Sequence, residues 1–160
     1  MRLRTSILIF AYVYVAAWAA APVVNVTGKV SFKPSSLVYG KSAQGIVTLT
    51  VPAGYHINAN PASQDFLIPT VLTPSKNVLY SISSIVYPMP KTVTVAGAPT
   101  KVYEGTVPIK FKLTMKPLKA KQKPASSVPF VAAIRYQACN ATNCFAPSLV
   151  TVKTTLKVVR

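Results

Sequence analysis

The chain has 160 residues, with 18 lysines and arginines against 2 acidic residues, which gives a formal charge of +16 at pH 7. This length indicates one domain, with or without a targeting segment, and the positive charge indicates an anionic partner or surface. Nucleic acid is disfavoured, because the basic residues are mostly scattered lysines and no aromatic, arginine-rich motif accompanies them. We expect an exported protein adapted to an acidic or anionic setting, with no nucleic-acid partner.

The N-terminus has the pattern of a secretory signal peptide. Two arginines near the start precede an apolar run over 7–18, and small alanines then occupy the −3 and −1 positions of a cleavage site after Ala19. The run is short for a membrane span, which needs about 20 residues. We expect a signal peptide over 1–19, a mature domain over 20–160, and a periplasmic or secreted location without an integral membrane segment. The alternative is an uncleaved anchor.

The rest of the chain has the composition of β-structure. Valine and threonine are abundant, proline is frequent, and no stretch keeps a helical period over three turns. The expected strands, in chain order, are 24–32, 45–51, 66–72, 78–86, 92–95, Thr106–Met115, 128–138 and 148–158. Short strands at this spacing, separated by proline and glycine signals, predict an all-β fold of the antiparallel β-sandwich type.

Thr106–Met115 is the clearest of these strands, because apolar and polar residues alternate along its whole length. That alternation is typical of a strand with one face in the core and one in solvent. The core face of this strand is expected to carry Val107, Ile109, Phe111, Leu113 and Met115. In 128–138 the corresponding residues are Phe130, Ala132, Ile134, Tyr136 and Ala138. In 148–158 they are Val150, Val152, Leu156 and Val158.

Both cysteines lie between the last two expected strands. Pairing of those strands would place Cys139 and Cys144 opposite each other across a four-residue loop, at a separation that suits a disulfide. Export would place them in an oxidising compartment, where a single intramolecular pair can form. A ring of this size adds only about 2 kcal/mol of chain-entropy stabilisation, whereas a turn exposes sulfur to an incoming thiolate. The spacing leaves a structural role and a redox role both open.

Other chemistries lack the residues they need. Structural zinc requires four cysteine or histidine ligands, and this chain has two cysteines and one histidine, so only a two-cysteine copper(I) site stays open. A hydrolytic triad needs a cysteine, a histidine and a carboxylate together, and this chain has a single histidine, His56, and two carboxylates, Asp65 and Glu104. A cysteine held in a disulfide is also not a free nucleophile. We therefore expect neither a cofactor nor a bound metal. His56 lies where a strand is expected to end in a turn, and we expect it on the surface or hydrogen-bonded.

Four segments carry a resemblance to a known family. They are Gly54-Tyr55-His56-Ile57-Asn58-Ala59-Asn60-Pro61, then Phe66-Leu67-Ile68-Pro69-Thr70, then Val102-Tyr103-Glu104-Gly105, and finally the run from Tyr136-Gln137-Ala138-Cys139 to Cys144-Phe145-Ala146-Pro147. In order and spacing they resemble the periplasmic N-terminal domain of the thiol:disulfide interchange protein DsbD, over about 25–159. The match is better to the short, free-standing branch of that family than to the three-domain transporter.

The resemblance implies an immunoglobulin-like β-sandwich whose two cysteines shuttle reducing equivalents. By resemblance, Cys144 makes the mixed disulfide with a partner and Cys139 resolves it. Residues 95–100 fall where the family has a cap loop over the disulfide, but here they lack the aromatic and acidic residues of the bacterial DsbD cap. Further residues that the resemblance places near the site are His56, Asn58, Tyr136 and Phe145.

The partners implied are a thioredoxin-like or membrane electron-donor protein and thiol–disulfide proteins of the envelope. The sequence has no Cys-X-X-Cys motif, so we expect its electrons to come from a separate protein. Two functional hypotheses follow. One is a thiol–disulfide exchange module, a component of a protein-disulfide reductase. The other is an immunoglobulin-like binding or assembly module with a purely structural disulfide.

Overall fold

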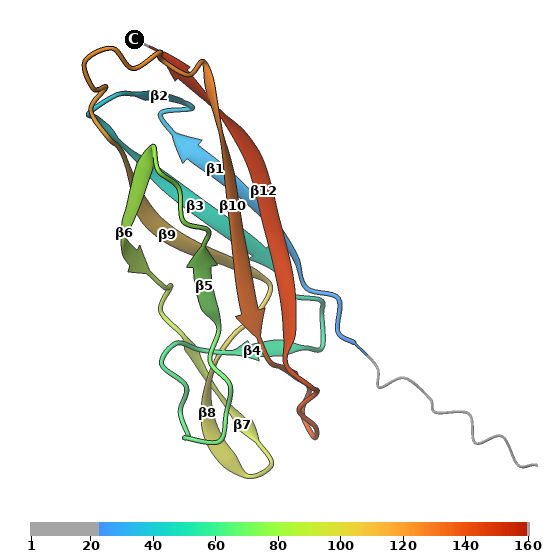
Figure 1. Cartoon of the computed structure of the whole chain (residues 1–160). Helices are drawn as coiled ribbons and strands as arrows, with labels where there is room; N and C mark the ends of the chain where they lie inside the picture. Colours follow the sequence, from blue (N-terminus) through green and yellow to red (C-terminus); the bar gives the residue numbers. More distant parts are fainter. Residues whose placement is uncertain (1–22, 160) are drawn as a thin grey trace, which may run out of the picture.

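The structure is a computed structural model that describes residues 23–159, and within them the chain forms strands and no helix (Figure 1). None of the described residues therefore belongs to a helix that could cross a membrane. The expected signal peptide lies outside the described residues. The strands are β1 (Thr27–Lys33), β2 (Ser36–Val38), β3 (Ser42–Thr50), β4 (His56–Asn58), β5 (Val71–Pro74), β6 (Tyr80–Val86), β7 (Lys91–Val95), β8 (Ala98–Tyr103), β9 (Thr106–Met115), β10 (Ser127–Tyr136), β11 (Ala138–Cys139) and β12 (Ser148–Val159).

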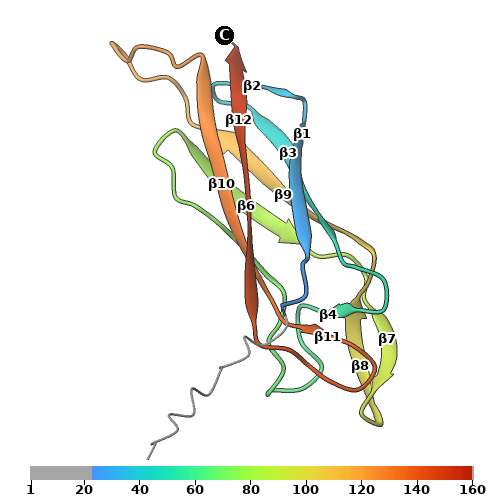
Figure 2. The same ribbon diagram turned by 90° about the vertical axis from the view of Figure 1, so that its right-hand side faces the viewer.

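Two four-stranded sheets form a sandwich along the length of the molecule (Figures 1 and 2). Their strand orders are β1-β3-β9-β6 and β2-β12-β10-β5. Neighbouring strands are antiparallel, except that β2 runs parallel to β12. The predicted fold class, an all-β, immunoglobulin-like sandwich, is confirmed.

The core lies between the strand faces that the apolar alternation predicts. All five apolar residues expected on the inner face of β9 are buried, and so are the five expected on 128–138. Phe111 of β9 stacks on Phe130 of the opposite sheet, with ring centroids 5.4 Å apart and an interplanar angle of 8°. Gly45 lies directly opposite Phe111 on β3, and a Cβ at Gly45 would overlap the Phe111 ring. The missing side chain of Gly45 therefore makes room for the central aromatic pair.

A third, smaller sheet of order β11-β4-β8-β7 lies at one end of the sandwich, the lower end in Figures 1 and 2. β10 passes into β11 through one residue, Gln137, so this core strand leads straight to Cys139. β7 and β8 form a hairpin whose two loop residues, Ala96 and Gly97, have φ values of 48° and 82°. Positive φ at both positions is the signature of a tight type I′ turn. This end sheet positions the cysteines.

Strand prediction failed mainly at this end of the molecule. β2, β4 and β8 were not predicted, and the prediction of a strand over 66–72 is wrong except at its last two residues. Pro69 has no N–H to donate to a sheet, and the N–H of Ile68 donates to the side chain of Gln137. A regular ladder therefore begins only at Val71. The other expected strands agree with the observed ones within three residues at each end.

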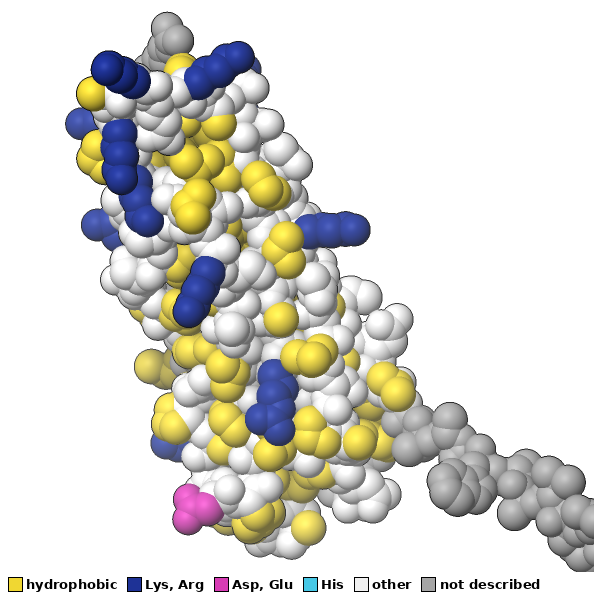
Figure 3. Space-filling model, viewed as in Figure 1, with side chains coloured by type: hydrophobic (Ala, Val, Ile, Leu, Met, Phe, Trp, Pro, Cys, Tyr) yellow, Lys and Arg dark blue, Asp and Glu magenta, His cyan; other side chains and the backbone are white. Residues whose placement is uncertain are grey.

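Basic side chains are spread along the face shown in Figure 3, and acidic side chains are visible on that face only near the lower end. An ion pair links β7 to the residue that follows β8, with Nζ of Lys91 3.2 Å from Oε2 of Glu104. The side chains of Lys110 and Lys112 are exposed on the outer face of β9, as the alternation predicts.

Candidate redox site

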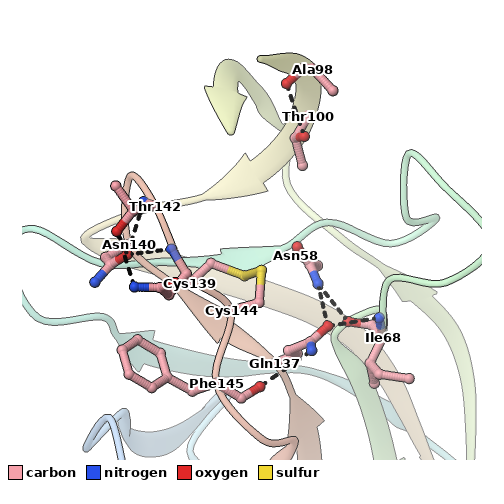
Figure 4. Close-up of a disulfide and its surroundings, with 11 residues drawn as sticks. Asn58, Ile68, Ala98, Thr100, Gln137, Cys139, Asn140, Thr142, Cys144 and Phe145 are labelled. Atoms are coloured by element: carbon pink, nitrogen blue, oxygen red, sulfur yellow. Dashed lines mark hydrogen bonds between the residues drawn. A yellow bond between two sulfur atoms is a disulfide. The ribbon is translucent and has the colours of Figure 1, made fainter. Parts of the chain in front are cut away.

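A disulfide joins Cys139 and Cys144 across a hairpin loop, as the sequence predicts (Figure 4). The two residues form an antiparallel bridge with their Cα atoms 4.0 Å apart. Oδ1 of Asn140 accepts hydrogen bonds from the backbone N–H groups of Thr142 at 3.0 Å and Asn143 at 2.7 Å. Asparagine favours turns because its side chain can bond to the backbone in this way. The loop therefore holds its shape through its own residues.

The two half-cystines differ sharply in exposure. Cys139 is only 1% exposed, because β11 pairs with β4 and places Cys139 directly opposite His56. Cys144 lies on the returning arm of the hairpin, outside any named strand, and is exposed. Of the two half-cystines, Cys144 is therefore the one that solvent reaches.

The disulfide opens on a cavity of about 260 Å³ between the hairpin, β4 and the β7–β8 turn. The expected cap segment, 95–100, contributes one wall of this cavity, and Figure 4 shows Ala98 and Thr100 on the strand above the sulfurs. The side chains of that wall are small, which leaves Cys144 exposed. The cavity is lined by His56, Asn58, Gln64, Phe66, Leu67, Val95, Ala96, Ala98, Thr100, Cys139, Thr142 and Cys144.

Gln137, which we did not predict as a site residue, ties the hairpin to its surroundings (Figure 4). Its Oε1 accepts hydrogen bonds from Nδ2 of Asn58 and from the N–H of Ile68, both at 3.0 Å. Its Nε2 donates to the carbonyl oxygen of Phe145 at 3.2 Å. One amide thus joins both arms of the hairpin to β4 and to the loop after it. Its place in the Tyr-Gln-Ala-Cys segment was the only sequence signal for this role.

His56 and Asn58, two of the expected site residues, both lie in β4 and line the cavity. His56 is 6% exposed and its Nε2 has no hydrogen-bond partner among the described residues, so the expectation of a surface or hydrogen-bonded histidine is wrong for that atom. The reason is that 56–58 is a strand between β8 and β11, not a turn. Burial lowers the pKa of His56, and the negative charge of Glu104 opposes that shift.

Tyr136 and Phe145, the other two expected residues, do not line this cavity. Tyr136 is buried in the core, and its hydroxyl donates to the carbonyl oxygen of Val24 at 2.9 Å. Phe145 packs against Tyr55 with ring centroids 5.8 Å apart. Both side chains support the ends of the hairpin from outside the cavity. Within residues 23–159, no group of three or more His, Cys, Asp or Glu side chains comes together to form a metal site.

The family model described as "Thiol:disulfide interchange protein DsbD, N-terminal" matches residues 25–156. The chain belongs to the DsbD N-terminal family. This confirms the resemblance seen in the sequence. Membership implies thiol–disulfide interchange, and the Cys139–Cys144 disulfide is the group in the described residues on which such exchange can act.

Among solved structures, this DsbD N-terminal-type chain is similar to the N-terminal periplasmic domain of ScsB from Proteus mirabilis. The two are 12% identical, and the TM-score is 0.49. The alignment covers 82% of this chain and 44% of that one, so the chain spans less than half the length of that structure. No curated protein matches the chain.

Proposed function

We propose that this protein is an exported thiol–disulfide exchange module that passes reducing equivalents through Cys139 and Cys144 to thiol–disulfide proteins of the envelope. The observation that carries the proposal is the difference in exposure between the two half-cystines at the mouth of a cavity. An exchange site needs one sulfur that a partner can reach and a second one held beside it. Membership of a thiol:disulfide interchange family supports the same reading.

Cys144 is the residue that forms the mixed disulfide, and Cys139 resolves it. In the reduced module, the Cys144 thiolate attacks one sulfur of a partner disulfide, and the partner's other sulfur leaves as a thiolate and takes up a proton. The Cys139 thiolate then attacks Sγ of Cys144, which releases the second partner thiol. The partner gains two electrons and two protons, and the module is left as the Cys139–Cys144 disulfide.

The module is then reduced again by the reverse sequence. The donor is a separate thioredoxin-like or membrane electron-transfer protein, whose thiolate attacks the exposed sulfur of Cys144. Residues 1–19 act as the signal peptide that directs the chain to the periplasm, where disulfides persist. The excess of lysine and arginine favours acidic partner surfaces and the thiolate form of an exposed cysteine.

Two cysteine variants with glutathione disulfide test this proposal. The reduced wild-type protein should convert glutathione disulfide into two glutathione thiols and end as the internal disulfide. Cys139→Ser should stop at a stable mixed disulfide on Cys144, detected as one bound glutathione by mass spectrometry. Cys144→Ser should react far more slowly, because its remaining thiol is buried.

Equal reactivity of the two single-cysteine variants would contradict the assigned order. Loss of folding in Cys144→Ser, measured by circular dichroism, would contradict the functional role of the pair. That result would favour a module whose disulfide is purely structural.

A further inference from the structure

Three buried polar atoms in the described structure have no hydrogen-bond partner, namely Nε2 of His56, Oδ1 of Asn58 and Oε1 of Gln64. All three residues line the cavity that contains the disulfide. Unpartnered buried polar atoms cost stability, so native structures keep few of them and those they keep need a reason. Of the three, the imidazole is the group that can exchange a proton near neutral pH.

The register of the end sheet brings this imidazole to the buried sulfur. Cys139 of β11 and His56 of β4 are directly opposed residues of an antiparallel pair. The Cβ atoms of such residues lie about 4.5–5.5 Å apart on the same face of the sheet. Both side chains line the same cavity, and both are more than nine-tenths buried. His56 is also the single histidine of the chain.

We propose that His56 is the proton acceptor for the Cys139 thiol in the step that resolves the mixed disulfide. The inference rests on the proposed exchange function and deepens it. Cys144 is exposed and can give up its proton to solvent, whereas Cys139 is 1% exposed and needs an acceptor within the protein. Thiols react as thiolates, so the removal of this proton controls the second step.

The proton and electron transfers of the resolving step need only the module and its partner. Nε2 of the neutral imidazole takes the proton from Sγ of Cys139. The resulting thiolate attacks Sγ of Cys144, the Cys139–Cys144 bond forms, and the bond between Cys144 and the partner sulfur breaks. The departing partner thiolate takes up the proton from the imidazolium, which restores neutral His56. When a donor reduces the module, the same groups act in reverse and His56 returns the proton to Cys139.

The surroundings of His56 suit a base that is neutral at rest. Burial lowers the pKa of His56, which keeps the imidazole unprotonated at pH 7. Two ionisable groups from the neighbouring strands lie on the same face of the end sheet as His56. They are Cys139 of β11 and Glu104, which follows β8. The Glu104 carboxylate in turn pairs with Lys91 of β7. Glu104 opposes the effect of burial and stabilises the imidazolium once it forms.

The test follows the two chemical steps separately with dithiobis(nitrobenzoate) as the disulfide. Attack by Cys144 releases one coloured thiolate, and resolution by Cys139 releases a second. In His56→Gln the first phase should keep its rate within about twofold. The second phase should slow by about 10²-fold at pH 7, the lower end of what a positioned base contributes. The difference should shrink at high pH, where hydroxide can take the thiol proton in place of the imidazole.

Tyr103→Phe is the matched control, because it removes a polar group from the same end sheet. The hydroxyl of Tyr103 contacts Asn60, and Tyr103 lies opposite Ile57 in the register, so its side chain points away from His56. Both phases should be unchanged in this variant. A second phase in His56→Gln within twofold of wild type from pH 6 to 9 would overturn the role of His56. So would equal slowing of both phases that persists at high pH.

If His56→Gln does not fold, a measurement on the wild-type protein tests the role of His56. Two ionisable groups that exchange a proton titrate as a coupled pair. The ring signals of His56, followed by NMR against pH, should therefore shift their midpoint between the oxidised and reduced forms. Identical titration in the two forms would overturn the inference. Absence of any second phase in the wild-type protein would instead overturn the proposed exchange function itself.

Discussion

The side chains of Gln137 and Asn58 meet in a hydrogen bond of 3.0 Å from Nδ2 of Asn58 to Oε1 of Gln137. The backbones of the same two residues form a second hydrogen bond, in which the N–H of Asn58 donates to the carbonyl oxygen of Gln137 at 3.2 Å. Gln137 lies two residues before the buried Cys139, and Asn58 lies two residues after His56. The pair therefore fixes β11 against β4 and holds the buried sulfur beside the imidazole.

Replacement of Gln137 by leucine should destabilise the oxidised protein by about 1–3 kcal/mol, because the N–H of Ile68 would lose its acceptor and Nδ2 of Asn58 would lose one of its two acceptors in a partly buried site. Urea unfolding measures this free energy. Gln44→Leu is the control, since Gln44 is exposed on β3. Equal effects of the two substitutions would mean that the Gln137 contacts contribute nothing specific.

Stability should fall in mildly acid solution, and His56 should account for part of the fall. Burial lowers the folded-state pKa of His56 below the value of about 6.5 expected in the unfolded chain. The unfolded chain thus binds more protons between these two pKa values, so stability is lost as the pH falls through that window and is fully present above it.

The measurement is urea unfolding of the wild type and of His56→Gln between a pH of about 7.5 and about 5. The wild type should lose more stability than the variant over this range. The two proteins differ only at position 56, so the difference between their curves reports the imidazole and its interactions. Parallel curves for the two proteins would show that His56 is not shifted in the way that its burial requires.

The sequence was informative where strands are long and have one face in the core. The alternation along Thr106–Met115 predicted that strand and its buried face, and the pattern over 128–138 did the same for β10. The position of both cysteines after β10 then predicted a disulfide across a hairpin. The strand pattern predicted the β-sandwich, and the family resemblance predicted its immunoglobulin-like form.

In the end sheet, β4 and β8 could not be predicted from the sequence, because they are short and lack the pattern of a long half-buried strand, whereas β7 was expected over 92–95. All three residues of β4 are buried, so His56–Asn58 shows no alternation. The exposure of Cys144 and the burial of Cys139 follow from pairing of β11 with β4, a contact between segments about 80 residues apart in the chain. The role of Gln137 depends on the same pairing.

Gly45→Ala should destabilise the protein by about 1–3 kcal/mol through overpacking, because the new methyl group would overlap the ring of Phe111. The cost should be smaller when Phe111 is replaced by leucine, which removes the ring. Thermal unfolding of the wild type, the two single variants and the double variant gives the coupling energy. Purely additive effects would contradict the contact between Gly45 and Phe111.

Ala96→Asn should stabilise the β7–β8 hairpin by up to about 1 kcal/mol, because Asn tolerates the left-handed conformation that alanine adopts there at a φ of 48°. The substitution also creates the Asn-Gly pair that type I′ turns prefer. Ala98→Asn, at the first residue of β8, should give no such gain. A lower melting temperature for Ala96→Asn than for the wild type would contradict this description of the turn.

The reduction potential of Cys139–Cys144 in the protein without residues 1–19 tests the exchange function most directly. Thiol alkylation across a series of redox buffers measures it. We predict a value of about −180 to −270 mV, the range of exchanging dithiols such as disulfide isomerase and thioredoxin. A value below about −300 mV would identify a structural disulfide that resists reduction, and would contradict the proposed function.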